Sequence, residues 1–182
     1  MTTIDLGRPE SGDVVELILE DHRRFEELLR KLRDDSSDRE AVRAAFSALH
    51  VAHAEAEEKY VYPVLRKRTS VTEHDEEHGE EEHAEGNEAL LAVLECASTD
   101  TQKFEDAVEK LAEKVNHHLT EEELTILNPA REEASEQVKA DLGDKFATER
   151  NKQIDNDCGS IENVRRLVKA AYAEGLRPAE GE

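Results

Sequence analysis

Four histidines and two glutamates stand where imidazole and carboxylate groups could act together. Each lies in line with a stripe of apolar side chains spaced three and four residues apart, which puts it on the buried face of a helix. Buried carboxylates are costly unless they are paired, hydrogen-bonded or bound to a metal ion. The pattern therefore predicts a metal site, with the candidate ligands His22, His53, Glu57, His83, His118 and Glu122.

The ligand types indicate which metal this site would take. His53 and Glu57 are four residues apart, as are His118 and Glu122, so each pair lies on one helical face and could share or bridge a cation. The two other histidines would complete the remaining sides. Six ligands exceed the number in a closed tetrahedral zinc site, and mixed imidazole and carboxylate ligands suit iron or manganese. We therefore expect a dinuclear centre bridged by carboxylates.

The elements that must position these ligands are helices. No Gly or Pro occurs between Asp13 and Tyr62, and no strand-like alternation is present. Capping boxes at Ser37, Ser70 and Thr99 indicate helix starts. The predicted helices span roughly 13–34, 38–67, 71–96 and 100–133, followed by a weaker helix at about 135–155 and an amphipathic helix after Ser160.

We expect an all-α fold, an up-down-up-down four-helix bundle with a C-terminal helical extension. The two halves repeat, since His22 and His83 each precede a leucine by seven residues and each His-x-x-x-Glu-Glu segment precedes a proline. This duplication predicts two helical hairpins related by a pseudo-twofold axis. Residues 1–150 would hold the bundle and the helix after it, and 151–182 a turn, the amphipathic helix and a tail. That helix would pack back on the bundle, associate with a second copy or contact another partner.

The third helix contains three histidines, and its register decides which of them faces inward. His83 lies seven residues before Leu90 on the buried face, whereas His78 and His74 point about 140° and 180° away at about 100° per residue. Glu80 with His83 has the Glu-x-x-His spacing of ferritin-like sites, but no other helix carries a second copy. We therefore select His83.

Three side chains beside the ligands are candidates to hydrogen-bond or supplement them. Tyr60 lies one turn beyond Glu57 on the inward stripe, where it would hydrogen-bond a ligand, coordinate metal or pack in the core. Glu58 and Glu121 adjoin the two candidate bridging carboxylates. These three groups could act as acid or base near a bound oxidant, and none is assigned a catalytic role.

At these residues the sequence resembles the hemerythrin-like family, which carries the HHE cation-binding domain. It matches the pattern His, His-x-x-x-Glu, His, His-x-x-x-Glu, with local similarity such as Asp-His-Arg-Arg-Phe-Glu-Glu-Leu-Leu at 21–29, over about 13–150. The resemblance implies a non-haem centre of two iron ions bridged by the two carboxylates and an oxo or hydroxo group. Different members bind O2 or react with hydrogen peroxide or nitric oxide.

The sequence departs from that family pattern in two places. Hemerythrins proper carry two ligating histidines four residues apart in the third helix, which makes His74 and His78 the alternative pair if our register is wrong. Pro129 lies eleven residues after His118, where the equivalent spacing in the second helix is ten. This extra residue predicts a bulge near the end of the fourth helix, with Glu121 and Glu123 as alternatives to Glu122.

Composition limits the partners. The 24 Lys and Arg against 45 Asp and Glu give a net charge of −21, which repels phosphate backbones and anionic membranes, so we expect no nucleic-acid or membrane binding. The longest apolar run, 89–94, is six residues, so we expect neither a membrane span nor a signal peptide, and a cytoplasmic location. Residues 69–102 contain no Lys or Arg, which favours a solvated face or a path that draws cations inward.

Two functions follow as hypotheses. In the first, iron with an open coordination position binds or reacts with a small oxidant, namely O2, hydrogen peroxide or nitric oxide, and catalase-like decomposition of peroxide is the enzymatic form. In the second, the chain is an iron store or an iron or oxygen sensor without turnover, whose metal occupancy orders the bundle.

Overall fold

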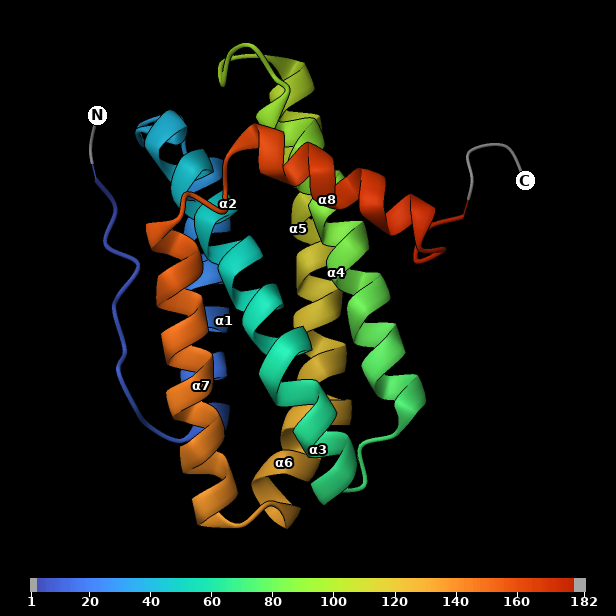
Figure 1. Cartoon of the computed structure of the whole chain (residues 1–182). Coiled ribbons are helices and arrows are strands. Elements are labelled where there is room, and N and C mark those ends of the chain that lie inside the picture. The colour runs from blue at the N-terminus through green and yellow to red at the C-terminus, as the bar shows by residue number, and fades with distance from the viewer. Residues whose placement is uncertain (1–2, 179–182) are drawn as a thin grey trace.

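The computed structural model describes residues 3–178, and every regular element in that range is helical (Figure 1). The α-helices are α1 Val14–Leu32, α2 Arg39–Ala56, α3 Tyr62–Arg68, α4 Glu73–Leu94, α5 Gln102–Glu122, α6 Asn128–Glu133, α7 Glu136–Asp155 and α8 Ile161–Ala173.

Two π-helical segments interrupt the long helices. The first, η1 Glu57–Val61, joins α2 to α3, and the second, η2 Glu123–Leu127, joins α5 to α6. A proline follows each segment by two residues, Pro63 and Pro129. Proline lacks an N–H donor and its ring clashes with the carbonyl four residues earlier in an α-helix, so a widened turn relieves that clash. The predicted bulge in the fourth helix is confirmed, and the second helix has one as well.

The helix starts differ from the predicted caps in detail. The observed N-cap residues of α2, α4 and α5 are Asp38, Thr72 and Thr101. The predictions of Ser37, Ser70 and Thr99 were each wrong by one or two residues. At all three places several residues with cap-forming side chains follow one another, so composition alone does not single out the residue at which the first turn closes.

The helices that carry the candidate ligands pack around a common interior. Contacts run from α1 to α2, α2 to α4, α4 to α5 and α5 back to α1, which is consistent with the predicted four-helix bundle. The helix α7 lies against α1 and α2, and α8 runs across α4, so the last helix packs back on the bundle (Figure 1). In the described part of the chain, none of the helices has the length and apolarity to span a membrane.

The buried core is divided into two apolar clusters. One contains Phe25 and Phe46, and the other contains Ile18 and Phe146. His22 lies on α1 between Ile18 of one cluster and Phe25 of the other. The predicted polar residues therefore form a layer inside the bundle with apolar packing on either side, which excludes bulk water from them.

Candidate metal centre

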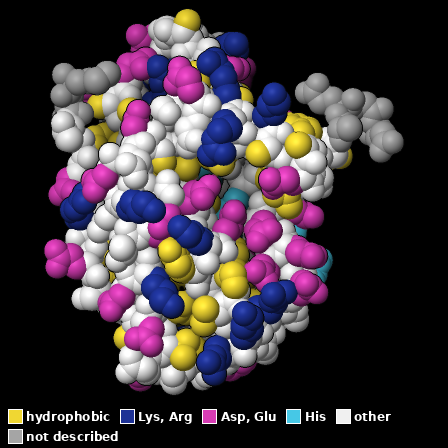
Figure 2. All heavy atoms as spheres, viewed as in Figure 1, with side chains coloured by type: hydrophobic (Ala, Val, Ile, Leu, Met, Phe, Trp, Pro, Cys, Tyr) yellow, Lys and Arg dark blue, Asp and Glu magenta, His cyan; other side chains and the backbone are white. Residues whose placement is uncertain are grey.

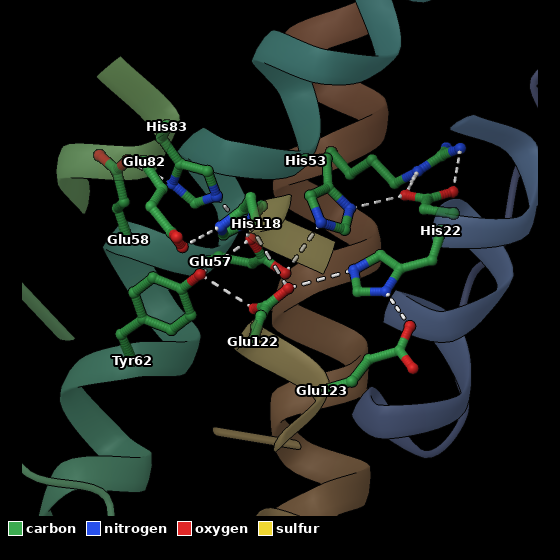
Figure 3. Close-up of polar contacts among 12 residues, drawn as sticks. His22, His53, Glu57, Glu58, Tyr62, Glu82, His83, His118, Glu122 and Glu123 are labelled. Carbon is green, nitrogen blue, oxygen red and sulfur yellow. Dashed lines mark hydrogen bonds and ion pairs between the residues drawn. The ribbon is translucent and has the colours of Figure 1, made fainter. Parts of the chain in front are cut away.

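The six predicted ligands come together in this layer. Their side chains reach it from α1, α2, the start of η1, α4 and α5 and point toward one another (Figure 3). Each residue is at most 5% exposed. Six titratable side chains in a water-excluded layer need mutual compensation or a cation.

Glu57 links two groups of candidate ligands. Its Oε1 lies 2.9 Å from His53 Nε2, and its Oε2 lies 3.2 Å from His83 Nε2. One group consists of His22, His53, Glu57 and Glu122, and the other of Glu57, His83 and His118. A carboxylate with one oxygen toward each group could contact a cation in either of them.

Glu122 belongs to the first group and approaches His118 of the second from the opposite hairpin. Its Oε2 lies 3.1 Å from His22 Nε2 and 3.7 Å from His118 Nε2, and its Oε1 accepts a hydrogen bond of 2.9 Å from Tyr62. Each glutamate therefore connects a histidine of its own helix with a histidine of the other hairpin. The arrangement matches the duplication that the sequence predicts.

Every one of the four histidines also has a carboxylate partner at Nδ1. Such a partner fixes the ring orientation and tautomer and raises the basicity of the other nitrogen. With Nδ1 engaged outward, each Nε2 is directed into the centre. The pairs are His22 with Glu123 at 2.9 Å, His53 with Asp21 at 3.2 Å, His83 with Glu58 at 2.7 Å and His118 with Glu82 at 2.9 Å.

These partners follow a rule that the sequence carries twice. In each hairpin an acid precedes the first histidine and an acid follows the bridging glutamate, as in Asp21-His22 and Glu57-Glu58. Sequence reasoning named Glu58, considered Glu123 only as an alternative ligand, and missed Asp21 and Glu82. The repeated acidic neighbours were the signal that could have identified them.

The η1 segment changes which tyrosine faces the centre. Tyr60, which the α-helical register placed on the inward stripe, is partly exposed, and Lys59 Nζ lies 5.0 Å above its ring. The expectation for Tyr60 was therefore wrong, because the widened turn advances the inward position along the chain. Tyr62 is fully buried. Its ring stacks on that of His83 with 5.9 Å between the ring centroids, and its hydroxyl donates a hydrogen bond to Glu122.

Other candidates lie outside this centre. His74 is exposed and His78 half-exposed on α4, so the alternative pair of histidines does not face the interior. Among the described residues, Glu121 makes no side-chain hydrogen bond or ion pair with the six, and Glu123 takes the place beside His22. The register chosen for the third helix therefore agrees with the structure.

The donor atoms of the centre fit a bound cation. His53 Nε2, His83 Nε2 and His118 Nε2 are buried without a hydrogen-bond partner in the described structure, and so is Glu57 Oε1. The close approach of His53 Nε2 to Glu57 Oε1 is thus a contact without hydrogen-bond geometry. Leaving a buried polar atom unsatisfied costs about 1–3 kcal/mol. Coordination of a metal ion would satisfy all four atoms.

Without a bound cation, protons on the histidines balance the negative charge of the buried carboxylates. Burial opposes the charged form of His53, but Glu57 and the hydrogen bond with Asp21 raise its pKa to about 10. Burial likewise opposes charge on His83, yet the neighbouring carboxylates of Glu57 and Glu58 raise its pKa well above the usual range. The buried charge of Glu57 is in turn favoured by His53, which holds the pKa of that carboxyl well below its ordinary value.

Loading with metal should therefore release protons, because an imidazole must be neutral to act as a ligand. The pKa values of three histidines, His22, His53 and His83, are raised, so we expect up to three protons released per chain at neutral pH. Calorimetry of metal binding in buffers of different ionisation enthalpy measures this number. A binding enthalpy that is the same in every buffer would contradict it.

A buried ion pair fastens α7 to the centre. Arg150 donates from Nε and one Nη to the two oxygens of Asp21 at 2.7 and 2.9 Å, and both residues are at most 1% exposed. Asp21 also contacts His53 Nδ1. The helix after the bundle thus orients a candidate ligand through one carboxylate, a contact that sequence reasoning did not identify.

Comparison with known proteins agrees with this geometry. The model of the hemerythrin HHE cation binding domain matches residues 13–130, which contain all six candidate ligands. A relative described as a DNA nickase, from Nostoc sp. (strain PCC 7120 / SAG 25.82 / UTEX 2576), is 28% identical over 143 residues, or 77% of this chain. The chain spans about 40% of that relative's length. No solved structure matches. Because this family model matches most of the chain, the chain belongs to the hemerythrin HHE cation-binding domain family.

Proposed function

We propose that this chain is a non-haem di-iron protein that binds or reacts with a small oxidant, namely O2, hydrogen peroxide or nitric oxide. The observation that carries the proposal is Glu57, whose two oxygens face two separate groups of buried imidazole nitrogens. Four imidazoles and two carboxylates favour iron over a structural zinc ion. Bound iron would supply redox and Lewis-acid chemistry for the oxidant.

The protein would restrict access by size. A small cavity of about 10 Å³ lies beside the centre, lined by side chains that include Phe25, His50, His53, His83 and His118. This volume is about what one water-sized molecule needs. Diatomic molecules and peroxide are the oxidants that this cavity favours.

Tyr62 would hold a proton at the centre. Burial, together with the neighbouring carboxylate of Glu122, raises the pKa of its phenol well above the usual value, so it stays a donor. It donates to Glu122 at 2.9 Å and to Glu57 at 3.3 Å. Leu127, which lies five residues after Glu122 as Tyr62 lies five after Glu57, has no hydroxyl. The phenol therefore makes the two sides of the centre different.

Replacing Tyr62 with Phe should weaken iron binding by about tenfold and alter the absorption spectrum, since loss of a group that orients a ligand typically costs 10- to 100-fold. Tyr60→Phe, two residues earlier in η1, is the matched control and should leave both unchanged. Iron titrations followed by absorption compare the two variants. A larger effect of Tyr60→Phe would show that the register at η1 is wrong.

The proposal is tested by adding O2, hydrogen peroxide or nitric oxide in separate experiments to the iron-loaded chain while recording absorption and, with peroxide, evolved oxygen. Repeated oxygen evolution supports a catalase-like activity, and a persistent, reversible change in absorption supports binding. If two irons are present and the spectrum responds to none of the three oxidants, the store or sensor hypothesis replaces ours. DNA nicking is not part of this proposal, because the net charge of −21 opposes binding of the chain to a phosphate backbone.

A further inference from the structure

A third group of metal-ligating side chains lies at the surface beside the buried centre. It consists of His78 and Glu82 on α4 and His117 on α5. Glu82 Oε1 lies 3.4 Å from His78 Nε2 and 3.2 Å from His117 Nε2. The side chains of His78 and His117 are 45% and 60% exposed, and that of Glu82 is 6% exposed. Two accessible imidazoles thus converge on one buried carboxylate.

The carboxylate of Glu82 faces both the surface and the centre. Its Oε2 contacts His118 Nδ1 at 2.9 Å, while its Oε1 is buried and has no hydrogen-bond partner in the described structure. The orphaned oxygen is the one nearest the two surface imidazoles. A buried carboxylate oxygen left in this way is unfavourable unless something binds it.

The helical geometry explains how the three residues meet. His78 and Glu82 are four residues apart on α4, so their side chains share a face. His117 immediately precedes His118 on α5, so that the two rings diverge, one toward solvent and the other into the bundle. Acidic side chains gather on the α4 side of the molecule, with histidine visible among them (Figure 2). The local field therefore attracts cations.

We propose that His78, Glu82 and His117 form a surface site for a divalent transition-metal ion, separate from the buried pair and one carboxylate away from it. Two imidazoles and one carboxylate are donors for zinc or iron rather than for magnesium or calcium, and water would complete the coordination. Because two of the three ligands are exposed, the ion would exchange readily with solvent.

The shared carboxylate gives this site a role in loading. An ion held by Glu82 Oε1 lies next to the side chain that orients His118, so the site would receive an ion on its way to the buried centre. This role rests on the proposed di-iron function, whereas the surface site itself does not. Loss of His117 should therefore slow iron uptake into the buried centre several-fold without lowering the number of irons that the buried centre finally holds.

The test is a zinc titration of the metal-free full chain, followed by dialysis and metal analysis at physiological salt. His78→Ala and His117→Ala should each bind one zinc ion fewer than the wild type, or bind that ion at least about tenfold more weakly. His74→Ala is the matched control, because His74 stacks on His78 at 6.0 Å but lies outside the group. It should bind as the wild type does.

Two results would overturn the surface site. Equal zinc binding by all four proteins would mean that Glu82 only forms ion pairs with the two histidines. Loss of an ion in His74→Ala but not in His117→Ala would mean that the exposed pair on α4 binds it instead. Repeating the comparison with Glu57→Gln separates the two proposals: the difference of one ion should persist whether or not that variant empties the buried centre.

Discussion

Replacing Glu57 with Gln is expected to abolish iron binding at both buried positions. Glu57 is the residue common to the two groups, with its oxygens 2.9 Å from His53 Nε2 and 3.2 Å from His83 Nε2. The amide keeps the shape of the side chain but carries no charge and offers one acceptor in place of two. Loss of a group that only orients a ligand costs 10- to 100-fold in affinity, so loss of the bridge should cost at least about 100-fold at each position.

Glu55→Gln is the matched control for this change. Glu55 lies two residues earlier on the same helix, is half-buried and belongs to none of the three groups. Its replacement should leave the iron content at the wild-type level, measured by metal analysis after desalting. Retention of two irons in Glu57→Gln would show that Glu57 is not the bridge. Loss of only one would show that Glu57 is needed at one position and not at both.

Replacing Arg150 with Ala is expected to destabilise the protein by about 3–5 kcal/mol, because it removes the buried cation of Asp21 and leaves that carboxylate only the partly exposed Arg24 at 3.2 Å. The change also removes hydrogen bonds from the guanidinium to the backbone carbonyls of Leu6 and Gly7, at 2.7 and 3.2 Å. For a domain of this size the midpoint of thermal unfolding should fall by on the order of 10 °C. Iron affinity should fall as well, because Asp21 orients His53.

Two further variants make the Arg150 prediction specific. Arg8→Ala breaks an exposed ion pair with Asp155 on the same helix α7, which solvent screens, so it should change the stability little. Arg150→Lys keeps the charge but loses the planar fork, so its stability should lie between those of the wild type and Arg150→Ala. Circular dichroism melts of the metal-free proteins compare them. Equal melting of Arg150→Ala and Arg8→Ala would contradict a role for the buried pair.

The candidate ligands could be found from the sequence because each one interrupts an apolar stripe. The stripe around His22, from Ile18 to Phe25, fixes which side of α1 is buried without any knowledge of the other helices. The same reasoning selected His83 over His74 and His78. Local periodicity and the duplication were therefore sufficient to bring the six side chains to one layer, while their role as metal ligands stays a prediction.

The remaining features of the site depend on an irregular helical turn and on tertiary packing, neither of which follows from the spacing of apolar residues. Tyr62, and not Tyr60, faces the centre because of the π-helical turn before Pro63. That turn shifts every later residue relative to an ideal α-helix. Arg150 meets Asp21 across 129 residues of sequence, through the packing of α7 on the bundle. Contacts of this kind depend on tertiary packing, which no single segment of the sequence determines.

The central claim is that two iron ions occupy the buried layer, one in each group that Glu57 joins. Diffraction from crystals of the iron-loaded chain, recorded on both sides of the iron absorption edge, tests it most directly. We predict two anomalous iron peaks, one beside His22 and His53 and one beside His83 and His118, with Glu57 contacting both. A single peak in the layer, or iron bound only elsewhere on the chain, would contradict the account.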